Sequence, residues 1–558
     1  AQDGSGVTLE RLNQFESLAA LRRNSKTEKE EDDTIEFADT DEVRVSIVLK
    51  TPSVLDKGFS VSGLASNAAA MEYSASLRRM QDGLTEKISG VLGNRLDVQW
   101  NLTLTANVIS ANVLYGQIET IKAVSDVKDV LIEPLYSVPE TETDEPNQYL
   151  ATGMTGTTGV WSAGLTGAGS RVAILDTGLS DKHQSFNNAA WLYAMELNAK
   201  AKGMTLDDYL KSVDILDLDE LTELLPKLHI KELVPELNAE DLYLSGKVPF
   251  SYNYADKGAC TDHFDGVSEH GSHVAGISAA NRYIPDGEGF TDAVQTVKVV
   301  GQAPDAQIIN MRVFNSAGGA RATDYLVAIE DAVLLGCDVV NMSLGSPSPG
   351  YTKYYNDYYD GIWQNVLKTD LVLSISMGNS YAWAQFAGAN GYNYLDTPTM
   401  YTGGNPGSRS EAFTVASVNN TSDMRQCFVL GRYAFSYYEY LPAGAPNLPF
   451  ITLDPEGNGK EFEYVYFADK AGMAEDFEGI DVAGKIIFLQ QSASNIPESG
   501  LTFVMPMNAE EVHCSIIDSA PAVYQMCFVL GGKDCTVRAA LLSASCSKKS
   551  PTARTSLK

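Results

Sequence analysis

Two histidines, His270 and His273, lie three residues apart in the segment VSEHGSHVAGISAA. A pair at this spacing could hold a metal ion, could place a general base beside an uninvolved neighbour, or could be two ordinary surface residues. The residues after His270, GSHVAGISAA, are typical of a helix start with small residues along one face. His273 would lie roughly 60° around that helix, where it could pack inward.

The metal alternative uses Cys260 and His263 together with the histidine pair. These four side chains form a C-x2-H string followed by H-x2-H, which looks like a zinc site. The segment between them, GACTDHFDGVSEHG, contains acidic residues and no strand-and-knuckle pattern. Zinc binding would also leave Asp176 without a role. The sequence therefore favours a general base at His270, with zinc binding as an open alternative.

Asp176 ends the apolar run VAILDTG, the pattern of a buried parallel strand that runs into a glycine turn. Such a carboxylate lies at the carboxyl edge of a sheet, where α/β proteins place their sites; an aspartate that only caps the turn is the alternative. The positive end of a helix disfavours an imidazolium at His270 unless a carboxylate compensates for it. An aspartate on Nδ1 would do so and would leave Nε2 as a proton acceptor.

Asn379 follows LVLSISMG, another apolar strand that ends in glycine. A side-chain amide at the carboxyl end of a strand can donate to a developing oxyanion. The alternative is an asparagine that only forms the turn.

The segments VAILDTG, HGSHVAG and SMGN, in this order, resemble the subtilisin-like serine proteases (subtilases, peptidase family S8). GQAPDAQIINMRVFNSAGG and AIEDAVLLGCDVVNMSLGS are similar to that family's sheet strand, helix and substrate-binding strand. The resemblance implies a serine endopeptidase with a Ser-His-Asp triad. Asp176 would orient His270 and compensate its charge, and Asn379 would be the oxyanion donor.

The resemblance also implies partners and a location. Ser343, Leu344 and Gly345, within NMSLGS, would pair with an extended substrate as an added β-strand. The expected partners are protein or peptide substrates and the chain's own propeptide. We expect no cofactor and no catalytic metal, and structural calcium sites stay open because the sequence does not reveal them. The resemblance implies that the protein acts outside the cell, secreted or on the cell surface.

The elements that must position these residues are apolar strands that alternate with helical segments over residues 139–436. This pattern predicts an α/β domain with a doubly wound parallel sheet covered on both faces. Residues 188–246 interrupt it with a leucine-rich and acid-rich block. We expect this block to be a helical insertion on the surface, and no chemistry is assigned to it.

Further domains flank the expected catalytic domain. Residues 1–42 are charge-rich and predict a flexible arm. Residues 43–138 alternate strand and helix patterns, predict a compact α+β module, and resemble the family's inhibitory propeptide. Residues 437–512 predict a small β-rich module similar to the opening of a protease-associated domain. Residues 513–558 form a cysteine-rich and basic tail that does not continue it convincingly.

The serine motif of the family, Gly-Thr-Ser-Met-Ala followed by proline, is absent from the 558 residues. We expect a truncated or frame-shifted product whose tail is read out of frame and whose chain as written is catalytically inactive. The alternative is a binding protein that keeps the substrate groove without the chemistry.

Composition sets outer limits on function. A formal charge of -31 argues against binding to nucleic acids or to anionic membranes. No run of 18 apolar residues occurs, so we expect no membrane span. The start, AQDGSG, has no signal segment, which indicates either a cytosolic chain or one whose signal peptide has been removed. The first 513 residues hold only three of the seven cysteines, which is not a disulfide framework.

Overall fold

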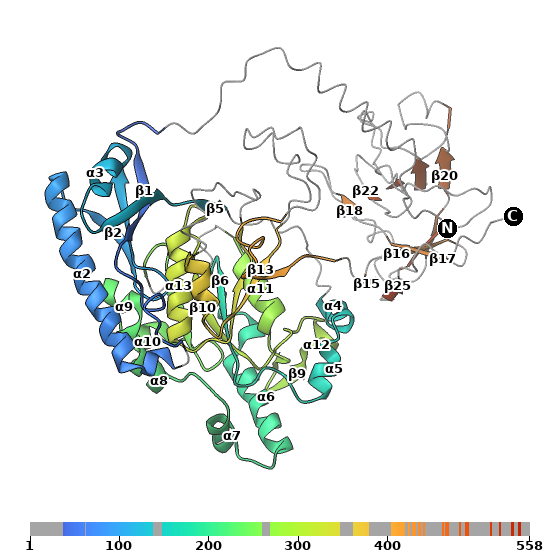
Figure 1. Ribbon diagram of the computed structural model, residues 1–558. Coiled ribbons are helices and arrows are strands. Elements are labelled where there is room, and N and C mark those ends of the chain that lie inside the picture. The colour runs from blue at the N-terminus through green and yellow to red at the C-terminus, as the bar shows by residue number, and fades with distance from the viewer. Residues whose placement is uncertain are drawn as a thin grey trace, which may run out of the picture. The chain divides into compact units, whose positions relative to one another are not determined.

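The computed structural model describes residues 37–61, 63–137, 148–258, 268–345, 361–378 and 403–418, together with short backbone segments between 422 and 547 (Figure 1). The first of its two compact units comprises residues 1–143 and 164–417. It contains an N-terminal α+β module and a larger domain built on a parallel sheet.

The N-terminal module has a four-stranded antiparallel sheet in the order β2-β3-β1-β4. Apolar side chains of β1 pack on the long helix α2, which starts at an Asn67 cap and ends at Gly93 in a left-handed conformation. Within the module, residues 96–113 contribute two strands, and the second helix is short. The elements are β1 Glu42–Leu49, α2 Ala68–Leu92, β2 Asp97–Leu102, β3 Val108–Leu114, α3 Ile118–Lys122 and β4 Val127–Ile132.

The central sheet has six parallel strands in the order β14-β13-β12-β6-β10-β7. Strand β6 lies between β10 and β12, so the chain leaves it toward one edge of the sheet and later returns to build the other. This is the topological switch point at which α/β proteins bind ligands. The strands are β6 Arg171–Asp176, β7 Phe250–Asn253, β10 Gln307–Arg312, β12 Val339–Met342, β13 Val372–Ser376 and β14 Phe413–Val415.

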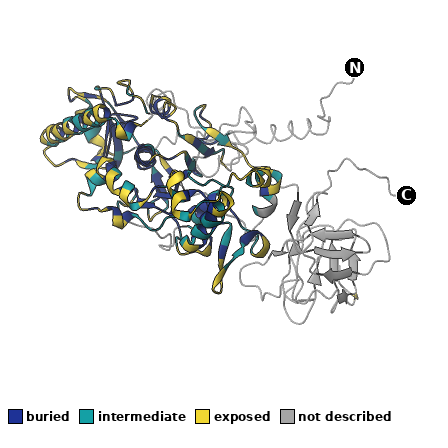
Figure 2. Ribbon diagram, turned by 90° about the horizontal axis from the view of Figure 1, so that it is seen from below, coloured by how far each residue is buried: buried dark blue, intermediate teal, exposed yellow. Residues whose placement is uncertain are grey.

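Helices cover both faces of this sheet, as the doubly wound pattern predicts. Alternate residues of β6 join different cores: Val172 and Ile174 pack with helix α11 (His270–Ala279), whereas Ala173 and Leu175 share the core of helix α13 (Ala322–Leu334). Nearly every residue of α13 is buried, and the buried residues are drawn in dark blue in Figure 2. Strand β6, which ends at Asp176, is therefore packed on both of its faces.

The block at residues 188–246 is helical. The expectation that it lies on the surface is wrong for its second half, which contributes to the buried core. The helices are α6 Asn188–Ala201, α7 Leu206–Ser212, α8 Leu218–Leu224, α9 His229–Leu233 and α10 Ala239–Leu242. Six leucines between 216 and 242 are buried in the same core as α13: Leu216, Leu221, Leu225, Leu228, Leu237 and Leu242. Their irregular spacing over short helices hides the common apolar face from a periodicity argument.

The second unit comprises residues 144–163 and 418–558. Its described backbone includes β20 (Tyr464–Phe467) paired in parallel with β21 (Ile486–Leu489), within the region predicted to be β-rich. Among the described residues, no helix has the length and apolar character needed to cross a membrane.

Candidate active site

Asp176 is the last residue of β6 and is 1% exposed. Its Oδ1 accepts a hydrogen bond from the Thr177 backbone N–H at 2.8 Å, which fixes the carboxylate against the turn that follows the strand. Its Oδ2 is buried and has no hydrogen-bond partner among the described residues.

The first residues of helix α11 lie against the turn that follows β6. Gly271 donates its backbone N–H to Thr177 Oγ1 at 2.9 Å, and the Thr177 hydroxyl donates to the Ser268 carbonyl at 3.1 Å. A Cβ at position 271 would lie 2.2 Å from the Gly178 carbonyl oxygen, so only glycine allows this approach. The His-Gly pair therefore lets the helix start reach the end of β6.

The close approach brings His270 onto Asp176. His270 Nδ1 lies 2.8 Å from Asp176 Oδ1, although the two residues are 94 positions apart in the chain. The imidazole is nearly buried, and the carboxylate is buried completely. A carboxylate that accepts the Nδ1 proton orients the ring and leaves the unshared electron pair on Nε2. In this arrangement Nε2 could accept a proton, and the role of His270 as general base stays a prediction.

His273 does not pack inward, because it is exposed on α11. Three residues advance a helix by roughly 300°, and here that rotation turns the side chain toward solvent. Among the described residues, no group of three or more histidine, cysteine or acidic side chains could hold a metal. Cys260 and His263 lie outside those residues, so the zinc alternative is not tested.

The expected substrate-binding segment follows β12. Asn341 pairs with Ile174 of β6, so two residues further on Ser343 lies level with Asp176 at the carboxyl edge of the sheet. Leu344 is fully buried, while Ser343 and Gly345 are half-buried. At Leu344, therefore, the backbone could contact a bound peptide but the side chain could not.

Asn379 lies outside the described residues. The strand before it, β13, pairs in parallel with β12 and ends at Ser376, three residues earlier. Its proposed role at the oxyanion stays a prediction.

The structure also contains a cluster of buried charges that the sequence did not single out. It lies where α13 meets the N-terminal module, and its acidic members on α13 are Asp324, Glu330 and Asp331. Trp100 of the module donates its indole N–H to Asp324 at 2.9 Å. The adjacent acids in AIEDAVLLG were an available signal, because ionised side chains inside an apolar helix need buried partners.

The module also extends a strand toward the larger domain. Strand β5 (Leu135–Ser137) pairs antiparallel with β11 (Gly319–Arg321), immediately before α13 begins. The Tyr136 side chain at the centre of β5 is buried against Tyr325, with ring centroids 5.6 Å apart. The segment that follows this strand, PETETDEPNQ (residues 139–148), is acidic and carries two prolines, a pattern that predicts a linker.

A sequence model of the subtilase family matches residues 167–551 of this chain. The match begins just before β6 and includes most of the tail at 513–558, whose out-of-frame origin stays a hypothesis.

The curated relatives that match are proteinases. The PII-type proteinase of Lacticaseibacillus paracasei is 28% identical over 403 residues, which cover 70% of this chain and 18% of the relative. The PIII-type proteinase of Lactococcus lactis subsp. cremoris is 30% identical over 330 residues, covering 58% and 14%. The minor extracellular protease Vpr of Bacillus subtilis is 25% identical over 366 residues, covering 66% and 33%. The chain thus spans a third or less of the length of these relatives.

Among solved structures, the epidermin leader peptide processing serine protease (EpiP) from Staphylococcus aureus matches with a TM-score of 0.39 and 15% identity. The match covers 69% of this chain and 71% of that chain.

Proposed function

The chain belongs to the subtilase family of serine proteases, and from this premise we propose that Asp176 and His270 are two members of a Ser-His-Asp triad that hydrolyses peptide bonds. The observation that carries the proposal is the 2.8 Å contact between His270 Nδ1 and Asp176 Oδ1 at the switch point of the sheet. His270 Nε2 would take the proton of the nucleophile, and Asn379 would donate to the oxyanion. Substrates would be proteins or peptides, paired along Ser343–Gly345 as an added strand.

The nucleophile is the missing part of this machinery. An acyl transfer needs an attacking oxygen, and no Gly-Thr-Ser occurs in the 558 residues. We therefore infer that these residues alone do not hydrolyse peptides through an acyl-enzyme. In subtilisin, loss of the serine lowers kcat by about 10⁶-fold. The absent motif also supports the second candidate function, a protein that binds peptides in the groove without cleaving them.

The N-terminal module is proposed to be an inhibitory propeptide. Two observations support this role: the β5–β11 pairing and the hydrogen bonds of the module to α13. The residues after Ser137 would occupy the groove like a product, and cleavage would occur within 138–147. We propose that the protein acts secreted or at the cell surface, a location supported by the name of its extracellular relative in Bacillus subtilis.

A fluorophosphonate probe, which reacts with activated serines, tests the catalytic proposal. The 558-residue chain is expected not to react and not to cleave its own linker. A product of the same gene that continues through a Gly-Thr-Ser-Met-Ala segment is expected to do both, and to lose both on His270→Ala. The exposed His183 is the matched control, because His183→Ala should leave labelling unchanged.

Two results would contradict the proposal. Labelling of the 558-residue chain that His270→Ala abolishes would show that one of its own serines is the nucleophile. Labelling of the longer product that survives His270→Ala would remove His270 as the base. Peptide binding by the 558-residue chain, with no turnover by the longer product, would favour the binding function.

A further inference from the structure

His229, the first residue of α9 in the insertion, lies between two buried carboxylates of α13. Its Nε2 is 2.9 Å from Glu330 Oε2, and its Nδ1 is 2.8 Å from Asp331 Oδ1. The imidazole side chain is 5% exposed and both carboxylates are fully buried. Asp331 also accepts the His229 backbone N–H at 2.8 Å and the Tyr254 hydroxyl at 3.0 Å.

This geometry favours an imidazolium between two ionised carboxylates. Both ring nitrogens face carboxylate oxygens, and only the doubly protonated ring can donate from both. Burial alone would lower the pKa of His229, but hydrogen bonds and charges from Asp331 and Glu330 outweigh it and raise that pKa well above 6.5. The cation also offsets two adjacent buried anions, which would otherwise be costly.

Glu330 connects the His229 imidazolium to the N-terminal module, because it is hydrogen-bonded to both. Its Oε2 accepts the backbone N–H groups of Thr103 and Leu104 at 3.2 and 3.1 Å. Its Oε1 accepts the backbone N–H and the hydroxyl of Thr105 at 2.5 and 2.6 Å. These three residues form the turn between β2 and β3, so one carboxylate of α13 satisfies three successive buried amides of the module.

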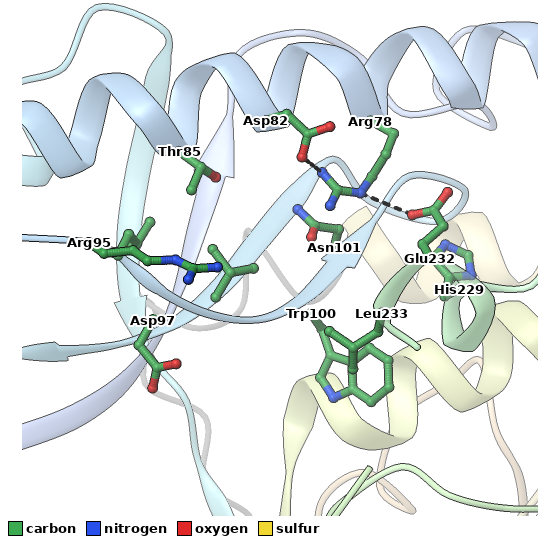
Figure 3. Close-up of a pocket in the computed structure, with 12 residues that line it drawn as sticks. Arg78, Asp82, Thr85, Arg95, Asp97, Trp100, Asn101, His229, Glu232 and Leu233 are labelled. Carbon is green, nitrogen blue, oxygen red and sulfur yellow. Dashed lines mark hydrogen bonds and ion pairs between the residues drawn. The ribbon is translucent and has the colours of Figure 1, made fainter. Parts of the chain in front are cut away.

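The insertion also contacts the module directly. Glu232 of α9 lies 3.0 Å from the Arg78 guanidinium of α2, which also pairs with Asp82 (Figure 3). Residues of α9, α2 and β2 line a cavity of about 500 Å³, and His229 is one of them. The other charged side chains around the cavity are Arg95 and Asp97.

We propose that helix α9 of the insertion is a second docking surface for the N-terminal module, and that the His229 imidazolium holds Glu330 ionised and oriented to receive the Thr103–Thr105 turn. His229 is a positioning residue in this arrangement, because it acts on the module through Glu330. The inference concerns how the module is held; it rests on the proposed inhibitory role only for its biological meaning.

The charge on His229 depends on pH. The pKa of His229 is raised above that of a free histidine, so its ion pairs with Glu330 and Asp331 stabilise the folded chain fully below the ordinary pKa of 6.5. The stabilisation is lost as the pH rises through the raised value. The charged groups facing the ring are Glu330 and Asp331 from α13, Glu232 from α9 and Arg78 from α2. His229 would therefore hold Glu330 in place for the module at neutral and mildly acidic pH and would cease to do so in alkaline solution.

Hydrogen exchange on the full chain, read by mass spectrometry, tests the proposal without any enzyme activity. His229→Gln removes the charge and one of the two ring donors. Exchange at Thr103–Thr105 should become at least about tenfold faster, because a hydrogen bond to a charged group typically contributes that much. Amides within β1 and β10 should keep their wild-type rates, which would show that the module and the sheet remain folded. His183→Gln is the control, because the exposed ring of His183 accepts a hydrogen bond only locally, from the Ser185 N–H, and exchange at Thr103–Thr105 should keep its wild-type rate.

A second variant covers the case in which His229→Gln destabilises the whole domain and also accelerates exchange in β10. The double variant His229→Gln, Asp331→Asn removes the uncompensated charge. It should restore the wild-type exchange rates of the β10 amides, while the amides of Thr103–Thr105 still exchange faster than in the wild type. Imidazole ¹⁵N shifts of the wild-type chain, which has six histidines, report the charge of His229 at pH 7. Unchanged exchange at Thr103–Thr105 in the folded variant, or a neutral His229 at pH 7, would overturn the proposal. Neither outcome depends on fluorophosphonate labelling, so the catalytic proposal can fail separately.

Discussion

Replacing Arg44 by methionine removes the cation that joins the N-terminal module to the start of α13. Arg44 Nη2 lies 2.7 Å from Asp324 Oδ1, and its Nε lies 3.3 Å from Glu133 Oε2. The Arg44 side chain is 9% exposed and the two acids are 3% and 0% exposed. The methionine keeps most of the apolar stem, so the change removes charge and hydrogen bonds rather than packing.

The expected loss is large because two buried carboxylates lose their common partner. Breaking a buried ion pair by removing one member costs about 3–5 kcal/mol, or roughly two to four orders of magnitude in the docking equilibrium. The pKa of Asp324 is already raised to about 6, mainly by burial, with the charge of Arg44 opposing the rise. Without Arg44 this pKa rises further. Protonation of Asp324 at low pH then removes part of the free-energy cost of the unpaired buried carboxylate. A raised carboxyl pKa stabilises the buried state only below that value, so the loss should be smaller at pH 5 than at pH 8.

Urea titration of the full chain measures this loss. Trp100 is 1% exposed and bonded to Asp324, so its emission should change when the module detaches. The matched control is Arg44→Met with Asp324→Asn, which removes one buried charge and should recover at least half of the lost stability. A shift below about 1 kcal/mol, an equal shift at pH 5 and pH 8, or no recovery in the double variant would refute the reasoning.

Four further predictions concern other parts of the chain. Gly271→Ala should destabilise the domain by about 1–3 kcal/mol in urea unfolding, because its Cβ would meet the Gly178 carbonyl, whereas Gly276→Ala on the open side of α11 should not. Cys337, whose pKa is raised to about 12 by burial, should resist iodoacetamide at pH 8 in the native chain, and rapid alkylation mapped by mass spectrometry would contradict its burial. Zinc added to a metal-free preparation should leave the far-UV circular dichroism unchanged, and a large change would revive the four-residue zinc site. The separately expressed segment 43–138 should inhibit a complete, active relative at micromolar concentration or below, and no inhibition at high excess would remove its assignment as a propeptide.

Local sequence patterns were sufficient for the sheet and for part of the site. The run VAILDTG predicted a buried parallel strand that ends at a carboxylate, and β6 ends at Asp176. HGSHVAG predicted a helix start at His270, where α11 begins. These predictions hold because strand and helix periodicity, and the glycines at the turns, depend on residues within a few positions of one another.

The leucine-rich block at residues 188–246 shows what local sequence pattern cannot predict. Its helices were predictable, but which of their faces is buried depends on α13 and on the N-terminal module, which lie far away in the chain. The same holds for His229, an isolated histidine in a leucine-rich stretch. Its partner Glu330 lies 101 positions further on in the sequence, and Glu330 in turn binds Thr103–Thr105.

The sequence by itself determined the doubly wound sheet, the α+β module and the residue types at the ends of the strands, because these follow from composition and short-range periodicity. The tertiary structure alone decided that His270 and Asp176 are 2.8 Å apart, that His273 faces solvent, and that Glu330 serves the module. The physical reason is that buried charged and hydrogen-bonding groups pair with groups that are close in space, whatever their separation in the sequence. Such distances are determined by packing between elements that are remote in the chain.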